Sequence, residues 1–286
     1  MDKQGDKDIM ADFSEEKKII KQIQDTIFPI ICEIDEFCRE RGIQYYLCAG
    51  SCLGAVRHHG FIPWDYDADI MFPRPDYERF IREYKEKPND KYEIGALEID
   101  PNWNLQYGRI WDKRTIFKKK NLNDMDIGAF VDIYPIDGFP ENQILVRSYL
   151  FRMRLYQFLG YASNKTAYLP TEKYVPLKKV IHLLVKPFGW RHFSKKMDRL
   201  ALKYPYEKSE HVGVGVAPDY GKREIMEKAF YNGEARCKFN DRELAIPKEY
   251  DKYLSTLYGD YMKVPEGAKE SSYAMVSRWE MIFKKG

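Results

Sequence analysis

Residues Tyr45–Phe72 read YYLCAGSCLGAVRHHGFIPWDYDADIMF and combine a small-residue turn with three alternating acids. The acids are Asp65, Asp67 and Asp69, and the apolar residues after them predict a strand. Because successive side chains of a strand point to opposite faces, Asp67 and Asp69 are expected on the same face. Two carboxylates this close repel each other, and a hard divalent cation relieves the repulsion. The spacing therefore predicts a Mg²⁺ site of the kind that substrate phosphates complete.

The same acidic triplet also opens an EF-hand calcium loop, which requires Gly at its sixth position and an acid, usually Glu, at its twelfth. Here those positions are Ile70 and Asp76, and Pro73 and Pro75 interrupt the expected exit helix. The EF-hand is therefore excluded. A solvated strand end with its acids turned to water is the other alternative.

A turn that suits phosphate binding precedes the acids. The residue types predict a strand ending at Cys48 and a short helix ending at Arg57, with Gly50 and Ser51 between them. Glycine lets the backbone approach an anion closely, and the N–H groups of a helix N-terminus point toward it. Gly50 and Ser51 are therefore expected to seat phosphates, with Arg57 as a further contact. An ordinary tight turn has the same pattern, so the turn alone does not decide between the two.

The segment GSCLGAVRHHGFIPWDYDADI resembles the signature of the LicD/fukutin family, whose members resemble nucleotidyltransferase-fold enzymes and transfer phospho-substituents onto sugar hydroxyls. Later segments match the family pattern in order: RIWDKRT at 109–115, VDIYPIDG at 131–138, and IPKEY at 246–250 continuing to LYGDYM at 257–262. The resemblance spans most of the chain after residue 20 and is weakest between 141 and 240. Tyr66 stands where many relatives carry a further Asp, but alternation turns that position to the opposite strand face.

The resemblance implies an α+β fold, with a nucleotidyltransferase-like mixed sheet flanked by helices over 14–140 and a mostly helical, basic accessory region over 141–286. It implies a Mg²⁺-dependent phosphotransferase, with Mn²⁺ as the alternative ion. The enzyme would transfer a phospho-substituent, most typically phosphocholine from CDP-choline, to a sugar hydroxyl of a cell-surface glycan or glycolipid and release CMP. Asp67 and Asp69 would hold the metal, and Asp132 would complete the site and accept the proton of the acceptor hydroxyl.

Asp132 lies in an apolar strand, where an ionised acid costs on the order of several kcal/mol unless it finds a partner. A shared metal is one partner, and capping of a turn before Pro135 is the alternative. Arg109 and Lys113 are further cations expected to bind substrate, although each could simply be solvated. Asp65, just outside the predicted strand, is expected to orient the site.

The donor alcohol is open between choline, ethanolamine, glycerol and ribitol. Aromatic faces recognise a quaternary ammonium, which favours choline if aromatic residues surround the site. Such residues fall within or beside the predicted catalytic strands, although they could equally be core residues: Trp64, Tyr66, Tyr107, Trp111 and Tyr134.

Two other functions remain open. A metal-dependent glycosyltransferase also uses Asp-x-Asp with a nucleotide-sugar, but a Gly-Ser turn about sixteen residues ahead of Asp67 suits a nucleotidyltransferase better. A catalytically inactive membrane- or glycan-binding module would bind the same acceptor without Mg²⁺, and the intact acids argue against it.

The composition is that of a soluble globular protein. The 286 residues are 32% charged and 44% hydrophobic, and the net charge of +3 is too small to imply a nucleic-acid partner. The polar start of the chain has no apolar segment typical of a signal peptide, so a cytoplasmic protein is expected. Five cysteines without metal-binding spacing are expected to be reduced and mostly buried.

Residues 144–204 are strongly basic and carry apolar residues at helical spacing, as expected for basic amphipathic helices. Two partners fit: the protein core, with basic side chains at its rim, or the inner face of an anionic membrane that carries a lipid-linked acceptor. The basic residues, against which stand only Glu172 and Asp198, are Arg147, Arg152, Arg154, Lys165, Lys173, Lys178, Lys179, Lys186, Arg191, Lys195, Lys196, Arg199 and Lys203.

Apolar spacing predicts a long helix over 14–41, with Ser14 as its N-cap, Pro29 expected to kink or break it, and Gly42 as its stop. Further along, it predicts a helix over 76–87, strands over 92–99, 105–117, 130–134, 211–216 and 235–239, and a helix over 248–258. The tail 265–286 is not assigned.

Overall fold

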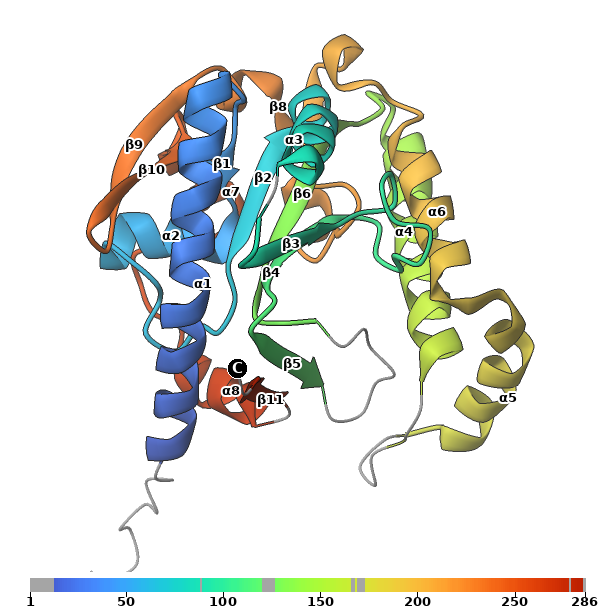
Figure 1. Ribbon diagram of the computed structural model, residues 1–286. Coiled ribbons are helices and arrows are strands. Elements are labelled where there is room, and N and C mark those ends of the chain that lie inside the picture. The colour runs from blue at the N-terminus through green and yellow to red at the C-terminus, as the bar shows by residue number, and fades with distance from the viewer. Residues whose placement is uncertain are drawn as a thin grey trace, which may run out of the picture.

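The computed structural model describes residues 13–87, 89–119, 127–165, 168, 173–277 and 279–284. A mixed sheet lies at the centre, helices cover it, and three helices stand along one side (Figure 1). The expected α+β class, with a mixed sheet flanked by helices, is confirmed.

The central sheet has one parallel strand pair at its middle. Its main path is β1 (Tyr46–Leu47), β2 (Asp69–Pro73), β6 (Phe130–Gly138), β4 (Gly108–Asp112) and β3 (Tyr92–Gly95), and β7 (His211–Gly213) with β8 (Met226–Glu227) extends it from the far end of β6. β2 and β6 run parallel, and the other pairs are antiparallel. The register places Asp69 opposite Asp132 and Asp132 opposite Arg109.

The two faces of this sheet differ in chemistry. Ile70, Ile110 and Ile133 are fully buried on one face, which α1 (Ser14–Arg41) and α3 (Arg74–Glu86) cover. Residues one position away point to the other face because side chains alternate along a strand. That second face therefore carries the polar residues Asp69, Asp132 and Arg109.

The long first helix continues through Pro29, so of the kink or break expected there the break is wrong, and the kink stays a prediction. Pro29 lies on the exposed side of α1, and Asp25, four residues before it, is also exposed, so water can bind the carbonyl that the proline leaves without an N–H. Ser14 is the first helical residue rather than the N-cap. Gly42 ends the helix with a φ of 61°, a left-handed conformation that glycine adopts without strain.

The remaining elements surround this centre. They are α2 (Ala49–His58), β5 (Thr115–Lys119), α4 (Gln143–Asn164), α5 (Val175–Val185), α6 (Gly189–Ala201), β9 (Glu234–Phe239), β10 (Arg242–Pro247), α7 (Tyr250–Tyr258), α8 (Ala268–Val276) and β11 (Trp279–Phe283), with short 3-10 turns at Lys186–Phe188, Tyr206–Lys208, Gly221–Glu224 and Lys228–Tyr231. β9 and β10 form a hairpin, and β11 pairs with β5. No described helix has the length and apolarity needed to cross a membrane.

Several predicted boundaries are corrected. The strand expected to end at Cys48 is only two residues long, and the strand expected over 105–117 is two strands separated by a turn at Lys113 and Arg114. The unassigned tail forms α8 and β11. The division of the chain at residue 140 stays a prediction, but β7 and α7, which follow it, both contact the centre of the fold.

Candidate active site

Four carboxyl groups gather at the start of the parallel strand pair. Asp69 opens β2, Asp67 and Asp65 precede it in extended chain, and Asp132 is the register partner of Asp69 on β6. The backbone fixes Asp69 at both ends, since its N–H donates to Ser51 Oγ at 2.9 Å and its carbonyl accepts from the Cys48 N–H at 2.9 Å. Asp69 and Asp132 are therefore held by strand pairing, whereas Asp65 and Asp67 lie in the segment just before β2.

These acids influence one another's pKa values. Burial and then the charge of Asp67 raise the pKa of Asp65 well above its ordinary value. Burial, then the charges of Asp67 and Asp132, do the same to the pKa of Asp69. Burial also raises the pKa of Asp67 and of Asp132, and the positive charge of Arg109 limits both rises. Burial and proximity therefore disfavour the charged forms of these carboxyl groups, a cost that a bound cation would relieve.

Arg109 is the cation that faces these acids. Its guanidinium donates to Asp132 through Nε at 2.5 Å and through Nη2 at 3.3 Å, and it stacks on the Phe130 ring at 3.7 Å. Both side chains of the Arg109–Asp132 pair are about nine-tenths buried. Arg109 is thus a fixed ionic partner that offsets the cost of burying the Asp132 carboxylate. The sequence did not indicate this pairing.

Two tyrosines border Asp132. The hydroxyl of Tyr134 donates to Asp132 Oδ2 at 3.4 Å, and the ring of Tyr107 lies 4.5 Å from the Tyr134 ring, centroid to centroid. All five aromatic residues considered for donor binding are partly buried and pack against the core. Trp111 stacks on Trp103 at 5.8 Å, and Trp64 lies under Lys269 of α8 at 5.2 Å. Tyr107 and Tyr134 are therefore the pair that this structure brings to the acids.

Gly50 and Ser51 lie beside the acids but belong to the first turn of α2, so the expected turn between strand and helix is corrected. A Cβ at Gly50 would lie 3.1 Å from Asp65 Oδ2, so a side chain there would crowd the carboxylate. Ser51 is buried and accepts the hydrogen bond from Asp69. Asp65 consequently sits at the N-terminal turn of α2, where the helix dipole favours negative charge.

The backbone just before Gly50 is strained. Ala49 has a φ of 41°, in the left-handed region that residues with a Cβ rarely adopt. Its N–H donates to the hydroxyl of Tyr253, on α7, at 2.9 Å. A residue more than two hundred positions away thus holds the turn in shape.

Arg57 and Lys113 do not join this cluster. Arg57 lies in the last turn of α2, about 10 Å along the helix from Gly50 at 1.5 Å per residue, and donates to the Tyr261 carbonyl at 2.7 Å. Lys113 follows β4 four residues after Arg109, about 13 Å along the strand, and donates to the Asn89 carbonyl at 2.9 Å. Their expected role in substrate binding stays a prediction, and in this structure both stabilise neighbouring backbone.

Other residues near the acids were not singled out from the sequence. Gln24 on α1 donates to the carbonyls of Ile62 and Asp65, at 3.1 and 2.8 Å, and so anchors the segment that carries the acids. Tyr220 and Tyr258 share a hydrogen bond of 2.8 Å, and the charge of Asp69 contributes to raising the pKa of each after burial. Tyr258 lies in LYGDYM, a segment that matches the family pattern, whereas Gln24 and Tyr220 carry no local signal.

The donor set suits a hard divalent cation, because carboxylate oxygens are the ligands Mg²⁺ prefers. Among the described residues, no group of three or more His, Cys, Asp or Glu side chains is placed to hold an ion. Mg²⁺ usually takes one or two protein carboxylates and completes its shell with water and substrate phosphates. Asp67 and Asp69 fit that smaller role, and the assignment of the metal stays a prediction.

The cysteines carry no chemistry at this site. All five are free, and Cys38, Cys48 and Cys52 are buried. Burial raises the pKa of Cys48 and of Cys52, so neither thiol ionises readily near neutral pH.

Comparison with known proteins agrees with this geometry. Residues 42–181 match the family described as LicD/FKTN/FKRP, nucleotidyltransferase domain. The lipopolysaccharide cholinephosphotransferase LicD of Haemophilus influenzae is 27% identical over 252 residues, which are 87% of this chain and 93% of the relative. The ribitol 5-phosphate transferase FKRP of human and of mouse is 59% identical over 29 residues, only 10% of this chain and 6% of each relative. The domain match and the relative that aligns along most of the chain show that this protein belongs to the LicD/fukutin family.

Proposed function

We propose that this protein is a Mg²⁺-dependent phosphotransferase that moves a phospho-substituent from a CDP-linked donor to a sugar hydroxyl of a cell-surface glycan or glycolipid and releases CMP. The observation that carries the proposal is the gathering of Asp65, Asp67, Asp69 and Asp132 beside the N-terminus of α2. The activities for which the relatives are named, transfer of phosphocholine to lipopolysaccharide and transfer of ribitol 5-phosphate, belong to the same reaction class.

Each residue has a role in this proposal. Asp67 and Asp69 would hold Mg²⁺, which when bound neutralises the donor phosphates and the charge that develops on the departing CMP. Gly50 and Ser51 would present the N-terminus of α2 to a phosphate, which the helix dipole stabilises. Asp65, beside the first turn of α2, would add negative charge to the same site.

The reaction exchanges one P–O bond for another. The acceptor hydroxyl oxygen attacks the phosphorus that carries the alcohol substituent, and the bond from that phosphorus to the bridging oxygen of CMP breaks. Asp132 takes the hydroxyl proton, and the bridging oxygen leaves with CMP. Arg109 keeps Asp132 oriented through its two hydrogen bonds, so it acts as a positioning residue in this step.

CDP-choline is the favoured donor. The rings of Tyr107 and Tyr134, which border Asp132, offer aromatic faces to a quaternary ammonium. A polyol has no such cation, so CDP-ribitol and CDP-glycerol would gain nothing from these rings. The protein would work in the cytoplasm, on an acceptor carried at the inner face of the membrane.

The test is a donor screen. CDP-choline, CDP-ethanolamine, CDP-glycerol, CDP-ribitol and a set of nucleotide-sugars are each incubated with the protein, Mg²⁺ and a glycan acceptor, and release of CMP is measured. Release from CDP-choline alone is expected, with loss of the reaction when EDTA removes Mg²⁺. Replacing Tyr107 by Leu should raise KM for CDP-choline, while the matched variant Trp111→Leu, on the same face but stacked on Trp103, should leave KM unchanged.

Consumption of a polyol donor in place of CDP-choline would refute the donor assignment and leave the phosphotransferase proposal standing. Turnover of a nucleotide-sugar with none of the CDP-alcohols would refute the proposal itself in favour of a glycosyltransferase.

A further inference from the structure

The outer side of α4 exposes an apolar stripe. Val146, Tyr149 and Met153 are buried on the inner side of this helix. Positions 144, 151, 155 and 158 lie on the opposite side, because steps of seven, four and three residues return to one face of a helix. These four side chains are exposed by 74% at Ile144, 68% at Phe151, 39% at Leu155 and 47% at Phe158.

α5 continues this apolar surface. None of its residues is buried, although a hydrogen bond of 2.7 Å between His182 Nδ1 and the Ala162 carbonyl joins it to α4. Leu183 and Leu184 are 72% and 66% exposed. The alternative in which the whole basic region packs into the core therefore holds for one face of α4 and of α6 but not for α5.

Positive charge borders the apolar surface. Arg147 and Arg154 lie on one edge of the α4 stripe and Arg152 on the other, by the same helical geometry. Exposed lysines flank the leucines of α5 at Lys179 and Lys186. Within the described part of 144–204 the acid is Asp198, which Arg74 holds at 3.3 Å. Outside that range Asp219 lies near Arg154, whose charge limits the rise that burial causes in the pKa of that carboxyl, so Arg154 is partly offset.

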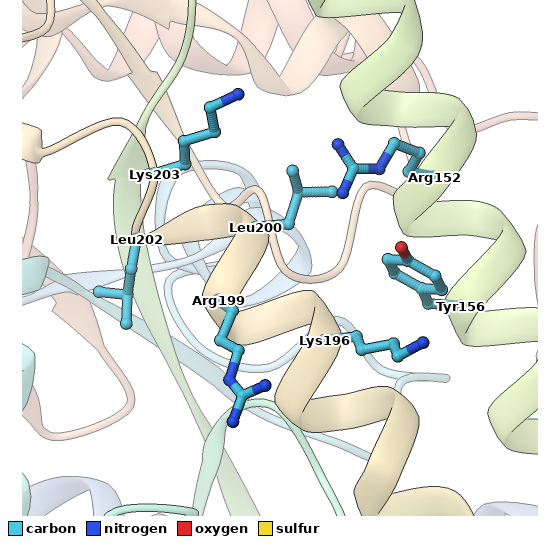
Figure 2. Close-up of a pocket in the computed structure, with 7 residues that line it drawn as sticks. All are labelled: Arg152, Tyr156, Lys196, Arg199, Leu200, Leu202 and Lys203. Atoms are coloured by element: carbon cyan, nitrogen blue, oxygen red, sulfur yellow. The ribbon is translucent and has the colours of Figure 1, made fainter.

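A basic groove of about 510 Å³ lies between α4 and α6, beside Arg152. Figure 2 shows Arg152 and Tyr156 projecting from α4 toward the end of α6. The described residues that line the groove include four cations and no acid: Arg152, Tyr156, Lys196, Arg199, Leu200, Leu202 and Lys203.

We propose that α4, α5 and this groove dock the protein on an anionic lipid bilayer, with the apolar side chains in the acyl boundary and the cations on headgroup phosphates. An amphipathic helix rich in Lys and Arg beside exposed Leu and Phe has the chemistry of an interfacial membrane helix. A second copy of the chain would cover the apolar surface but would bring the same positive charges together, whereas an anionic bilayer complements both features.

Docking would bring the membrane close to the acids. Arg191 of α6 donates to the carbonyls of Asp100 and Trp103, and Trp103 Nε1 donates to the Tyr107 carbonyl at 2.8 Å. α6, which packs on α4, is therefore tied to the segment that carries the tyrosine bordering Asp132. A lipid-linked acceptor could then reach the site while its anchor stays in the bilayer. Only this last consequence rests on the proposed function, because docking itself uses none of the acids.

The test measures binding of the full chain to vesicles by flotation. Vesicles of phosphatidylcholine with phosphatidylglycerol should bind the protein at least about tenfold more strongly than vesicles of phosphatidylcholine alone, and binding should fall steeply with salt. Leu183→Ser with Leu184→Ser should weaken binding about tenfold or more. Met275→Ser, which removes a side chain 48% exposed on α8, is the matched control and should bind like wild type.

A second pair of variants tests the charges. Lys196→Gln with Lys203→Gln should weaken binding to anionic vesicles by about fivefold for each charge and flatten its salt dependence. Lys18→Gln with Lys21→Gln, on the exposed face of α1, removes as much charge elsewhere and should have little effect. Thermal melting of each variant shows whether it is folded.

No binding to anionic vesicles at low salt would overturn the proposal. So would equal binding by the Leu183→Ser, Leu184→Ser variant, or a solution dimer that this double substitution dissociates. Asp69→Asn, which should lose transfer, should bind vesicles like wild type. Failure of docking and failure of the proposed function are therefore separate results.

Discussion

Replacing Asp69 by Asn removes one charge from the acid cluster and leaves its frame intact. The hydrogen bonds that hold this residue, to Ser51 Oγ and from the Cys48 N–H, use backbone atoms that Asn also has. Asn has nearly the same shape as Asp. Any change in stability should therefore come from electrostatics.

The size of the effect follows from the strand pairing. Asp69 and Asp132 are register partners on neighbouring strands, which lie about 4.8 Å apart. Two unit charges about 5 Å apart, at an effective dielectric constant of about 20, repel by about 3 kcal/mol. Proton uptake relieves part of this near neutral pH, because the pKa of Asp69 is raised. We expect Asp69→Asn to stabilise the metal-free protein by about 1–2 kcal/mol, which raises Tm by roughly 2–6 °C.

The assay is thermal melting with and without Mg²⁺, together with CMP release from the donor. Wild type should gain stability from Mg²⁺ in the presence of donor, since a ligand that binds only the folded state raises Tm. Asp69→Asn should start from a higher Tm, gain little from Mg²⁺ and lose transfer. Asp241→Asn, an exposed acid in the β9–β10 turn, is the matched control and should behave like wild type.

Two results would refute this reasoning. A lower Tm for metal-free Asp69→Asn would show that the cluster is not under net repulsion. A wild-type response to Mg²⁺ with retained CMP release would show that Asp69 does not hold the metal.

Three further predictions concern the same site. Burial and mutual repulsion raise the pKa of Asp69 above its usual 3.8, so the folded state binds protons more tightly than the unfolded state. The stability of the metal-free protein should therefore fall as pH rises from about 4 through the raised pKa, and the stabilisation by Mg²⁺ should grow. Thermal melting in a pH series measures both. Tyr253→Phe removes the acceptor of the Ala49 N–H and should cost about 1–2 kcal/mol in chemical denaturation while lowering kcat. Arg109→Met leaves Asp132 as an unpaired buried charge and should cost about 3–5 kcal/mol, most of which Arg109→Met with Asp132→Asn should restore without restoring transfer.

Each of these has a control or a contrary outcome. Stability that rises with pH in the absence of metal would contradict the direction of the acid pKa values. Tyr261→Phe loses only an exposed contact to Asp251 and should leave kcat unchanged, in contrast to Tyr253→Phe. A double Arg109, Asp132 variant no more stable than Arg109→Met would show that the cost came from lost packing on Phe130 rather than from the charge.

The features predictable from the sequence were local ones. The three acids alternate in the sequence, and strand geometry places Asp69, the first residue of β2, whereas Asp67 lies just before the strand. The first helix and its end at Gly42 follow from apolar spacing and from a glycine at the stop. The exposed position of Pro29 explains why a residue that usually breaks a helix is tolerated there.

The features missed depend on distant partners. The phosphate-binding role of Arg57 stays a prediction, but its hydrogen bond to the Tyr261 carbonyl, from the far end of the chain, was not foreseen. Tyr253 reaches Ala49 across a comparable separation. No local sequence pattern predicts contacts between residues that lie about two hundred positions apart in the chain.

The charges on β2 and β6 also disfavour a shifted register between these two strands. A shift of one residue along β6 would turn Asp132 toward the layer beneath α1 and α3 and bring Ile133 to the acid face. Asp132 would then lie among Ile70 and Ile110 without Arg109, and an ionised carboxylate in such a place costs on the order of several kcal/mol. Chains with this shifted register would therefore be unstable as well as inactive. The charge of Asp132, which serves the site, thus also disfavours incorrect pairing of β2 with β6.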